Sequence, residues 1–243
     1  MIGINLGLYA SQLSTNSPFS FGNSLRTLPS NDFVSFASGL GPIDGASKLS
    51  IHYWVKVDSS DIAVVGGGAS GGSRIHLLKF SNNNLIAVVA NGAGTLGFCS
   101  FNGFENTKAL VSLVFDGTLT GNENRCKLYI NAIQQTLSFQ GTIRPTIPNE
   151  SSDFRINSYE ITGEFGQADY NEIVITTDAS TPSQISSFYN SGNGNFANDS
   201  FTNILAYWQC NELDGSTLLT DSVGTAIGQL NNFVTPPAYF VPF

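Results

Sequence analysis

The sequence predicts an all-β fold in which two antiparallel sheets pack face to face. Three observations support this prediction: apolar and polar residues alternate along many short segments, turns rich in glycine and asparagine separate these segments, and only one stretch has the sequence features of a helix. Many short strands joined by tight turns are typical of a sandwich that closes over a shared core.

The clearest alternation runs from Leu49 to Val57, where five apolar side chains occupy every second position. A period of two places these side chains on one face of a strand, which we expect to be buried. The opposite face is polar except for Trp54. This tryptophan must either pack under a covering loop, which we favour, or contribute to a binding surface.

Eight further segments have the length and alternation of strands. They are 61–65, 74–80, 84–89, 95–101, 109–115, 126–131, 172–176 and 204–210. The turns between them contain pairs such as Asn91-Gly92 and Asp116-Gly117. Such residues favour chain reversal because they adopt positive φ or form hydrogen bonds with their own backbone.

One short helix is expected near 181–190. Thr181 is a capping residue, proline follows it, and Gln184 is placed to close a capping box. The apolar face of the helix would consist of Ile185, Phe188 and Tyr189. Gly192 is placed to end the helix, and the following residues to Asn203 are predicted to form a loop.

Length and charge limit the function classes. At 243 residues, with no convincing linker, we expect a single domain over 1–243. Charged residues make up 12% of the chain and the net charge is -8, so the surface is rich in hydroxyls and amides. Nucleic acid and anionic membranes bind clusters of lysine and arginine, so neither is an expected partner. No apolar run is long enough to predict membrane insertion.

The first residues of the chain and its three cysteines were considered for signs of processing and of disulfides. Residues Met1 to Ser14 lack the basic start and apolar stretch of a secretory signal, so the chain looks unprocessed. Either a signal has been removed, or the protein reaches its place by assembly into a particle, and the expected setting is a virion surface or the extracellular space. Cys99, Cys126 and Cys210 stand far apart and are expected to be buried thiols.

The order of segments resembles that of the laminin G-like, concanavalin A-like lectin superfamily. The segments that match, in order, are Phe21-Gly22 with Asn31 to Ser35; Leu49 to Lys56; Leu113 to Gly117 with Lys127 to Asn131; Gly166 to Ile175 with Ser180 to Gly192; and Leu205 to Trp208 with Asp221 to Gly224. Ala132 and Asn171 depart from the pattern, which has glycine and aspartate at these two positions.

This resemblance implies a two-sheet antiparallel jelly-roll sandwich, often with calcium near one rim and sometimes with glycan binding on loops or a concave face. The unprocessed start and the closing Tyr207-Trp208 segment further resemble proteins carried on bacteriophage particles. Such proteins commonly form oligomers with neighbouring subunits.

Four residues match family positions at which calcium could bind through oxygen ligands. They are Asp116, Asn171, Glu172 and Asp221. The alternative, which we favour slightly, is that Asp116 and Asp221 only brace turns. Asparagine at 171 also removes a charge that a calcium site would use.

Sugar recognition needs an exposed aromatic face beside hydrogen-bonding groups. Trp54, Tyr207 and Trp208 are the candidates, although large aromatic side chains in a sandwich belong more often to the core.

The segment 236–243 is apolar and proline-bearing, so it needs to be covered. Folding back on its own sandwich is the default expectation, and docking on a neighbouring subunit as a short extended tail is the second hypothesis. The residues expected to mediate such assembly are Pro237, Tyr239, Phe240 and Phe243.

The sequence motifs that could indicate catalysis are not supported by their predicted structural context. Gly66 to Gly71 and Gly92 to Gly97 fit nucleotide-binding spacing, but no helix follows either, so loops are expected. His52 and His76 lie within predicted strands, where ordinary roles in a sheet are favoured.

Glycoside hydrolysis requires two carboxylates on one strand face. The evenly spaced pairs Glu160 with Glu164 and Glu212 with Asp214 lie in predicted loops. We therefore predict a non-enzymatic structural or binding protein: a surface or decoration protein of a virion (head, fibre or tail), whose lectin-like sandwich binds neighbouring subunits and could also bind glycans. A free carbohydrate-binding lectin or adhesin module is the first alternative, and a glycoside hydrolase of the same fold is the second.

Overall fold

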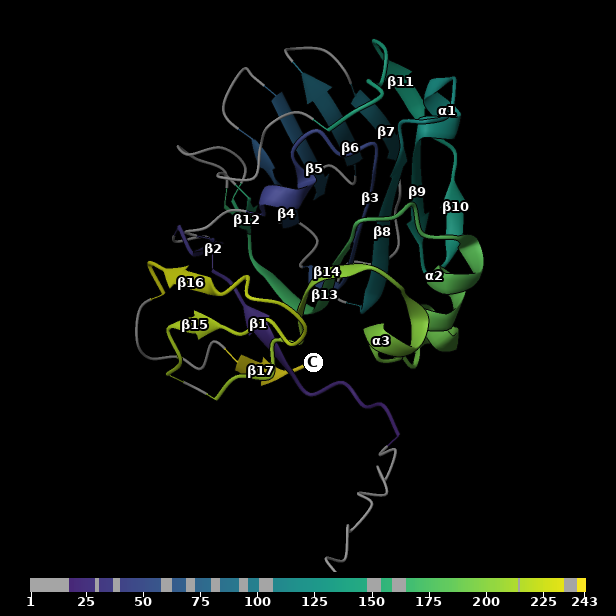
Figure 1. The fold of residues 1–243 in the computed structure, drawn as a ribbon. Helices are drawn as coiled ribbons and strands as arrows, with labels where there is room; N and C mark the ends of the chain where they lie inside the picture. The colour runs from purple at the N-terminus through teal and green to yellow at the C-terminus, as the bar shows by residue number, and fades with distance from the viewer. Residues whose placement is uncertain are drawn as a thin grey trace, which may run out of the picture.

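Two antiparallel β-sheets face each other across a common core in the computed structural model (Figure 1). The structure describes residues 18–28, 31–36, 40–57, 63–68, 73–79, 84–91, 96–100, 107–147, 154–158, 165–213, 215–233 and 240–243. The predicted all-β sandwich is therefore confirmed.

The first sheet has eight strands within the described residues. Its order is β10 (Ile133–Gln135), β9 (Cys126–Ile130), β8 (Ala109–Asp116), β3 (Lys48–Val57), β13 (Ala168–Thr176), β1 (Asn23–Arg26) and β17 (Phe240–Pro242), and β14 (Ile204–Trp208) also pairs with β13. Every pairing in it is antiparallel.

The second sheet has nine strands within the described residues. Its order is β11 (Ser138–Gln140), β7 (Leu96–Ser100), β6 (Asn84–Asn91), β5 (Ser73–Lys79), β4 (Ala63–Gly68), β12 (Arg155–Ile156), β2 (Phe33–Ser35), β16 (Gly228–Asn231) and β15 (Leu218–Leu219). The glycines Gly66 to Gly68, predicted to lie in a loop, continue strand β4.

The alternation along β3 places its apolar side chains between the sheets, as predicted. Leu49, Ile51, Tyr53, Val55 and Val57 all belong to the central core cluster, with Val34 and Val65 from the second sheet. Full burial of such a side chain contributes about 1.5–3 kcal/mol to stability. This strand, with β13 and β8 on either side, is therefore the centre of the first sheet.

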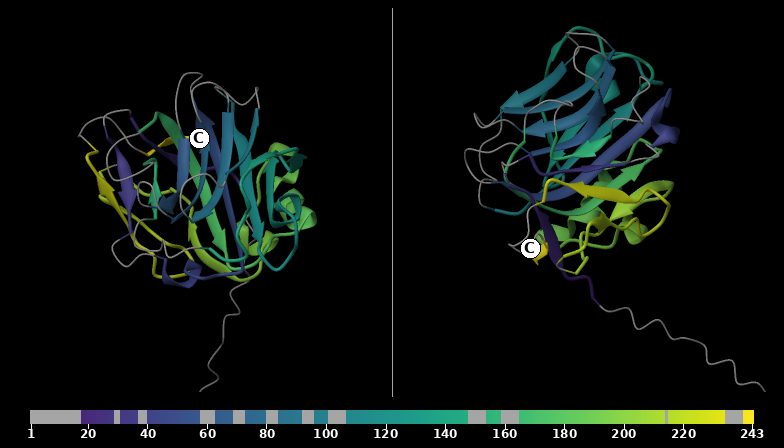
Figure 2. Two further views of the ribbon diagram at one scale, coloured as in Figure 1. Left: turned by 90° about the horizontal axis from the view of Figure 1, so that it is seen from above. Right: turned by 90° about the vertical axis from the view of Figure 1, so that its left-hand side faces the viewer.

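Part of the outer face of the first sheet is covered by two helices, α2 (Pro182–Tyr189) and α3 (Ala197–Ser200) (Figures 1 and 2). Ile185 and Phe188 of α2 pack with Phe201, which follows α3, in a second apolar cluster. Their partners on the sheet include Trp54 and Val174. Trp54, the one large apolar residue on the otherwise polar face of β3, is therefore covered by helix α2.

Helix α2 has the predicted capping box between Thr181 and Gln184. Its range agrees with the predicted 181–190, but the residue that ends it is Asn190, which adopts the left-handed conformation at the C-cap, and not Gly192, which lies two residues further on. Asparagine tolerates this conformation better than other residues with a side chain.

Within the residues that the structure describes, three further helical segments lie where turns or loops were expected or no element was predicted. They are α1 (Asn122–Arg125), α3 and η1 (Gly41–Ile43), and η3 (Asn190–Gly192) continues from α2. No helix among the described residues is long and apolar enough to cross a membrane.

Cys126 and Cys210 are free and buried, as predicted, whereas the side chain of Cys99 lies outside the described residues. Burial raises the pKa of the Cys126 thiol to about 12, so this group stays neutral at physiological pH.

Candidate functional site

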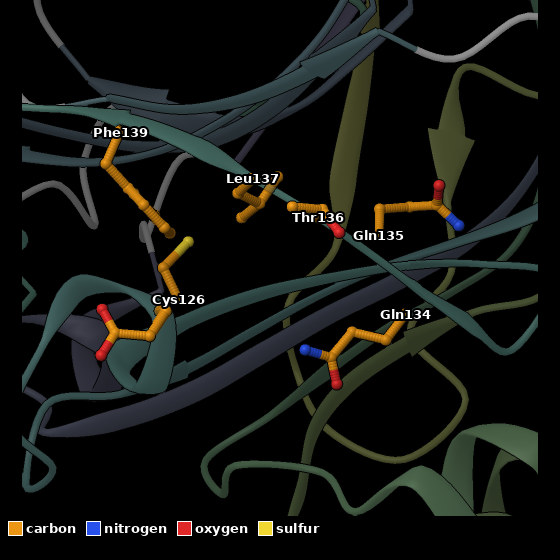
Figure 3. A pocket seen from close by; sticks show the side chains of 7 residues that line it. Cys126, Gln134, Gln135, Thr136, Leu137 and Phe139 are labelled. Carbon is orange, nitrogen blue, oxygen red and sulfur yellow. The ribbon is translucent and has the colours of Figure 1, made fainter.

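A pocket of about 250 Å³ opens at the edge of the sandwich where the chain crosses from the first sheet to the second (Figure 3). Strand β10 ends the first sheet, β11 ends the second, and Thr136 and Leu137 connect them. We call this site the edge pocket. Its lining consists of Glu123, Cys126, Gln134, Gln135, Thr136, Leu137 and Phe139.

Helix α1 forms one wall of the edge pocket and is fixed to the segment after β11. Asn122 donates from Nδ2 to the carbonyl of Gly141 at 2.8 Å, and its Oδ1 accepts from the backbone N–H of Ile143 at 2.8 Å. Arg125 donates to the carbonyls of Leu119 at 2.6 Å and Ile143 at 2.7 Å. These bonds hold the wall that carries Glu123 in place.

The polar lining offers donors and acceptors near the mouth of the pocket. Gln134 is exposed and accepts a hydrogen bond from Tyr129 Oη at 3.1 Å through Oε1, while its amide nitrogen has no partner among the described residues. Gln135 donates from Nε2 to the carbonyl of Ile133 at 2.8 Å. The amide of Gln134 and the exposed hydroxyl of Thr136 are therefore available to a ligand.

The inner part of the pocket is apolar. Figure 3 shows Cys126 and Phe139 pointing toward one another, and Leu137 lies between Phe139 and the polar residues of the mouth. Leu137 and Phe139 are half-buried and pack against the central core. A ligand with one apolar and one hydroxyl-bearing face matches this division of the lining.

None of the three aromatic residues predicted to contact sugar is available for stacking. Trp54 and Tyr207 are 1% exposed and Trp208 is fully buried. A ring that stacks on a pyranose must present an open face, so this prediction was wrong.

These aromatic side chains hold the sandwich together instead. Trp54 stacks on Tyr189 of α2, with ring centroids 5.7 Å apart, and meets the ring of Phe21 edge to face. Trp208 points to the inner side, packs on Phe36, and donates from Nε1 to a backbone carbonyl at 2.7 Å.

Asp116 and Asp221, considered as metal ligands, instead brace turns, which was the alternative favoured from the sequence. Asp116 accepts from the backbone N–H of Thr118 at 3.1 Å and pairs with Lys48 at 3.4 Å. Asp221 accepts three backbone N–H groups, those of Tyr207, Val223 and Ala226, at 3.0–3.1 Å.

Asn171 and Glu172 lie at a β-bulge in β13, and both are buried. Asn171 donates to the backbone carbonyls of Asn23 and Gln209, and Glu172 accepts from Tyr207 Oη. Burial raises the pKa of Glu172 from 4.5 to about 8, so the carboxyl is mainly protonated near neutrality. A protonated carboxyl is a poor calcium ligand.

The four predicted metal ligands do not converge on a common point. No group of three or more histidine, cysteine, aspartate or glutamate side chains in the described part of the chain could hold a metal ion. The structure therefore offers no calcium site made from Asp116, Asn171, Glu172 and Asp221.

The described end of the tail folds back on its own sandwich. Strand β17 pairs with β1, and Phe240 enters the central core. Phe243 contacts the ring of Phe21 with centroids 5.3 Å apart. Phe240 and Phe243 thus pack on their own sandwich, in agreement with the default expectation, while Pro237 and Tyr239 lie outside the described residues.

The residues of the edge pocket were not identified from the sequence. A weak signal was present, since Leu137 and Phe139 alternate with polar residues in the manner of a strand. The pocket itself depends on the crossing between the sheets, which no local pattern encodes.

Solved structures with a similar fold include proteins of several kinds. A protein from Bacteroides ovatus, whose proposed role is carbohydrate binding, has a TM-score of 0.60 at 15% identity over 89% of this chain. The present chain spans 60% of the length of that protein. No protein-family model matches the sequence, and no curated protein matches it.

Two further likenesses extend this comparison. The heptameric SAP-like pentraxin of Limulus polyphemus has a TM-score of 0.50 at 14% identity, over 70% of this chain and 80% of that chain. Trypanosoma rangeli sialidase, in a complex with 2,3-difluoro-KDN, has a TM-score of 0.50 at 15% identity, over 70% of this chain and 27% of the sialidase chain. The fold is therefore a lectin-like jelly roll.

Proposed function

We propose that this protein is a non-enzymatic glycan-binding protein and that the edge pocket receives one sugar residue. The observation that carries the proposal is the pocket itself, in which amide, hydroxyl and carboxylate groups face an apolar wall. The carbohydrate-binding role proposed for the similar Bacteroides ovatus protein supports it.

The lining matches the chemistry of a pyranose. The hydroxyls of a sugar need donors and acceptors, which Gln134, Thr136 and Glu123 supply, and its C–H face needs an apolar partner, which Leu137 and Phe139 supply. The volume of about 250 Å³ is below the usual range for drug-sized ligands. A terminal sugar residue therefore fits better than a longer internal segment.

Binding is favoured over hydrolysis because hydrolysis needs two carboxyl groups across the scissile bond. Glu123 is the one carboxylate in the lining of the edge pocket. Of the pairs considered from the sequence, Glu212 accepts a hydrogen bond from the backbone of Thr220 at 2.6 Å, and Asp214, Glu160 and Glu164 lie outside the described residues.

The setting that we propose is the surface of a virion or another extracellular particle, where the protein contacts neighbouring subunits. A surface rich in hydroxyls and amides, with few charges, supports this proposal. A free lectin or adhesin module is the alternative. Size-exclusion chromatography distinguishes them, because a particle subunit is expected to form oligomers and a free module to elute as a monomer.

A glycan array with calcium, and again with a chelator, tests the proposed function. We expect binding in both conditions, since no calcium site is assigned. Replacing Gln134 by alanine should weaken the best neutral ligand by about 2- to 10-fold, the value of one neutral hydrogen bond. Gln140→Ala is the matched control, because Gln140 is an exposed amide on β11 that does not line the pocket.

Two results would contradict the proposal. Equal binding by the Gln134→Ala and Gln140→Ala variants would exclude the edge pocket, and an array without any bound glycan would exclude the function. Hydrolysis of a polysaccharide panel by the purified protein would overturn the non-enzymatic assignment.

A further inference from the structure

Four charged residues form a row across the outer face of the first sheet. Arg26 of β1 is in register with Asp169 of β13, and Asp169 is in register with Lys56 of β3. Lys108 directly precedes Ala109, whose partner is Val55, so Lys108 continues the row beside Lys56. We call Arg26, Asp169, Lys56 and Lys108 the outer-face row.

The residues next to the row on each strand show to which side of the sheet the side chains of the row point. Leu25, Val55, Ala109 and Tyr170 point into the central core, so the next residue on each strand points to the opposite side. Lys56 lies two positions from Trp54, which packs beneath α2. The row therefore lies beside the helix-covered part of the same face.

The charges of the row do not balance. Both oxygens of Asp169 are engaged by Arg26, with Oδ1 2.7 Å from Nε and Oδ2 2.8 Å from Nη2. Lys48 elsewhere on the sheet pairs with Asp116, but Lys56 and Lys108 have no carboxylate partner in the described part of the chain. In a protein with 10 lysines and arginines and a net charge of -8, three cations in one row form a local positive site.

Lys108 is held in position by aromatic rings. Its Nζ lies 4.5 Å from the ring centroid of Phe21 and 5.2 Å from that of Phe243. Partial burial, followed by the charge of Lys56, lowers the pKa of Lys108. The two ammonium groups thus repel each other, and an anion placed between them would relieve this repulsion.

A recess lies against the row. It has a volume of about 210 Å³ and is lined by Arg26, Lys56, Gln167, Ala168 and Asp169. Because Asp169 is neutralised by its bidentate pairing with Arg26, the groups that remain for a ligand are the ammonium of Lys56 and the amide of Gln167. Both can donate hydrogen bonds to an oxyanion.

We propose that the outer-face row and its recess form a second binding site, for the carboxylate or sulfate group of an acidic saccharide. This proposal rests on the proposed glycan-binding function but uses a different part of the molecule. The row lies at the Ala109 end of β8, whereas the edge pocket lies beside Cys126, which pairs with Phe115 near the other end of that strand.

Calorimetry with three probes tests this site: an oligogalacturonate, the neutral galactose oligomer of the same length, and sodium sulfate. We expect the acidic oligomer to bind more tightly than the neutral one, and raised salt to weaken only the acidic one. Lys56→Gln should weaken the acidic oligomer about tenfold, the value of one charge-assisted hydrogen bond. Lys108→Gln should weaken it less, because Lys108 does not line the recess and acts on the ligand through its charge alone. Lys56→Arg should retain most of the affinity.

Lys127→Gln is the matched control, because Lys127 lies on β9 of the same sheet, outside the row. Equal affinity for the acidic and neutral oligomers, or an unchanged affinity in Lys56→Gln, would overturn the proposal. Sodium sulfate that binds as tightly as the oligomer would show an ion site only. If the wild-type protein shows no preference for the acidic oligomer but still binds neutral glycans in a Gln134-dependent manner, this site is refuted and the proposed function stands.

Discussion

At the scale of single residues, two buried ionisable side chains, His52 and Glu172, contribute to the pH dependence of stability. His52 contacts Ser180 through Nε2 at 2.9 Å and stacks on the ring of Phe201. Burial lowers the pKa of His52 from 6.5 to about 3 and raises the pKa of Glu172 from 4.5 to about 8. Both groups are therefore mainly neutral in the folded protein near neutrality.

These shifts predict that the free energy of unfolding is highest between about pH 4.5 and 6.5. His52 stabilises the fold above pH 6.5, and this contribution is lost as the pH falls toward 3. Glu172 stabilises it below pH 4.5, and this contribution is lost as the pH rises toward 8. Each group changes stability by about 1.4 kcal/mol per pH unit, so the two slopes cancel between 4.5 and 6.5.

Urea unfolding measured across this pH range checks the prediction. Glu172→Gln should remove the decline above pH 6.5, and His52→Gln should reduce the decline below pH 4.5. A wild-type stability that keeps rising from pH 6.5 to 8 would show that Glu172 is ionised in the folded protein.

At the scale of elements, α2 is the part that makes the outer face of the first sheet into a second core. Thr181 accepts from the backbone N–H of Gln184 at 3.3 Å, and Gln184 Oε1 accepts from the N–H of Thr181 at 2.8 Å. Without this helix, Trp54 and Val174 would be exposed on the surface of the sheet. The capping box is therefore linked to the packing of the whole face.

Thr181→Ala is expected to lower the free energy of unfolding by about 1 kcal/mol, because the helix loses one of its reciprocal capping bonds. Chemical denaturation measures this change. Ser186→Ala is the control, since Ser186 is exposed within the same helix and should leave stability nearly unchanged. An equal effect of both substitutions would show that the cap does not contribute.

At the scale of the whole molecule, the chain closes by bringing its described C-terminal residues against its N-terminal strand. Strand β17 pairs with β1 at the edge of the first sheet, and Phe240 fills part of the core. Residues 240–243 are therefore a structural element of their own sandwich.

Removal of residues 236–243 is expected to destabilise the monomer by about 3 kcal/mol or more, because a buried phenylalanine and the pairing of β1 are lost. Thermal unfolding and size-exclusion chromatography of the truncated protein check this. The point variant Phe240→Ala should reproduce much of the loss. A stable truncated monomer that no longer assembles would instead indicate that the tail docks on a neighbour.

The sequence by itself determined the fold class, the buried face of β3 and the capping box of α2. These features depend on local periodicity and on residues a few positions apart, which a sequence displays directly. The turn-bracing roles of Asp116 and Asp221 were also predicted, because aspartate before glycine or serine commonly forms such bonds.

Only the tertiary structure decided which side chains remain accessible. Trp54, Tyr207 and Trp208 looked suitable for sugar binding until α2 and the second sheet were seen to bury them. The edge pocket and the outer-face row join residues from different strands, and their positions depend on sheet order and register. Alternation along one strand assigns faces, but it does not specify what covers each face or which strand lies next to it.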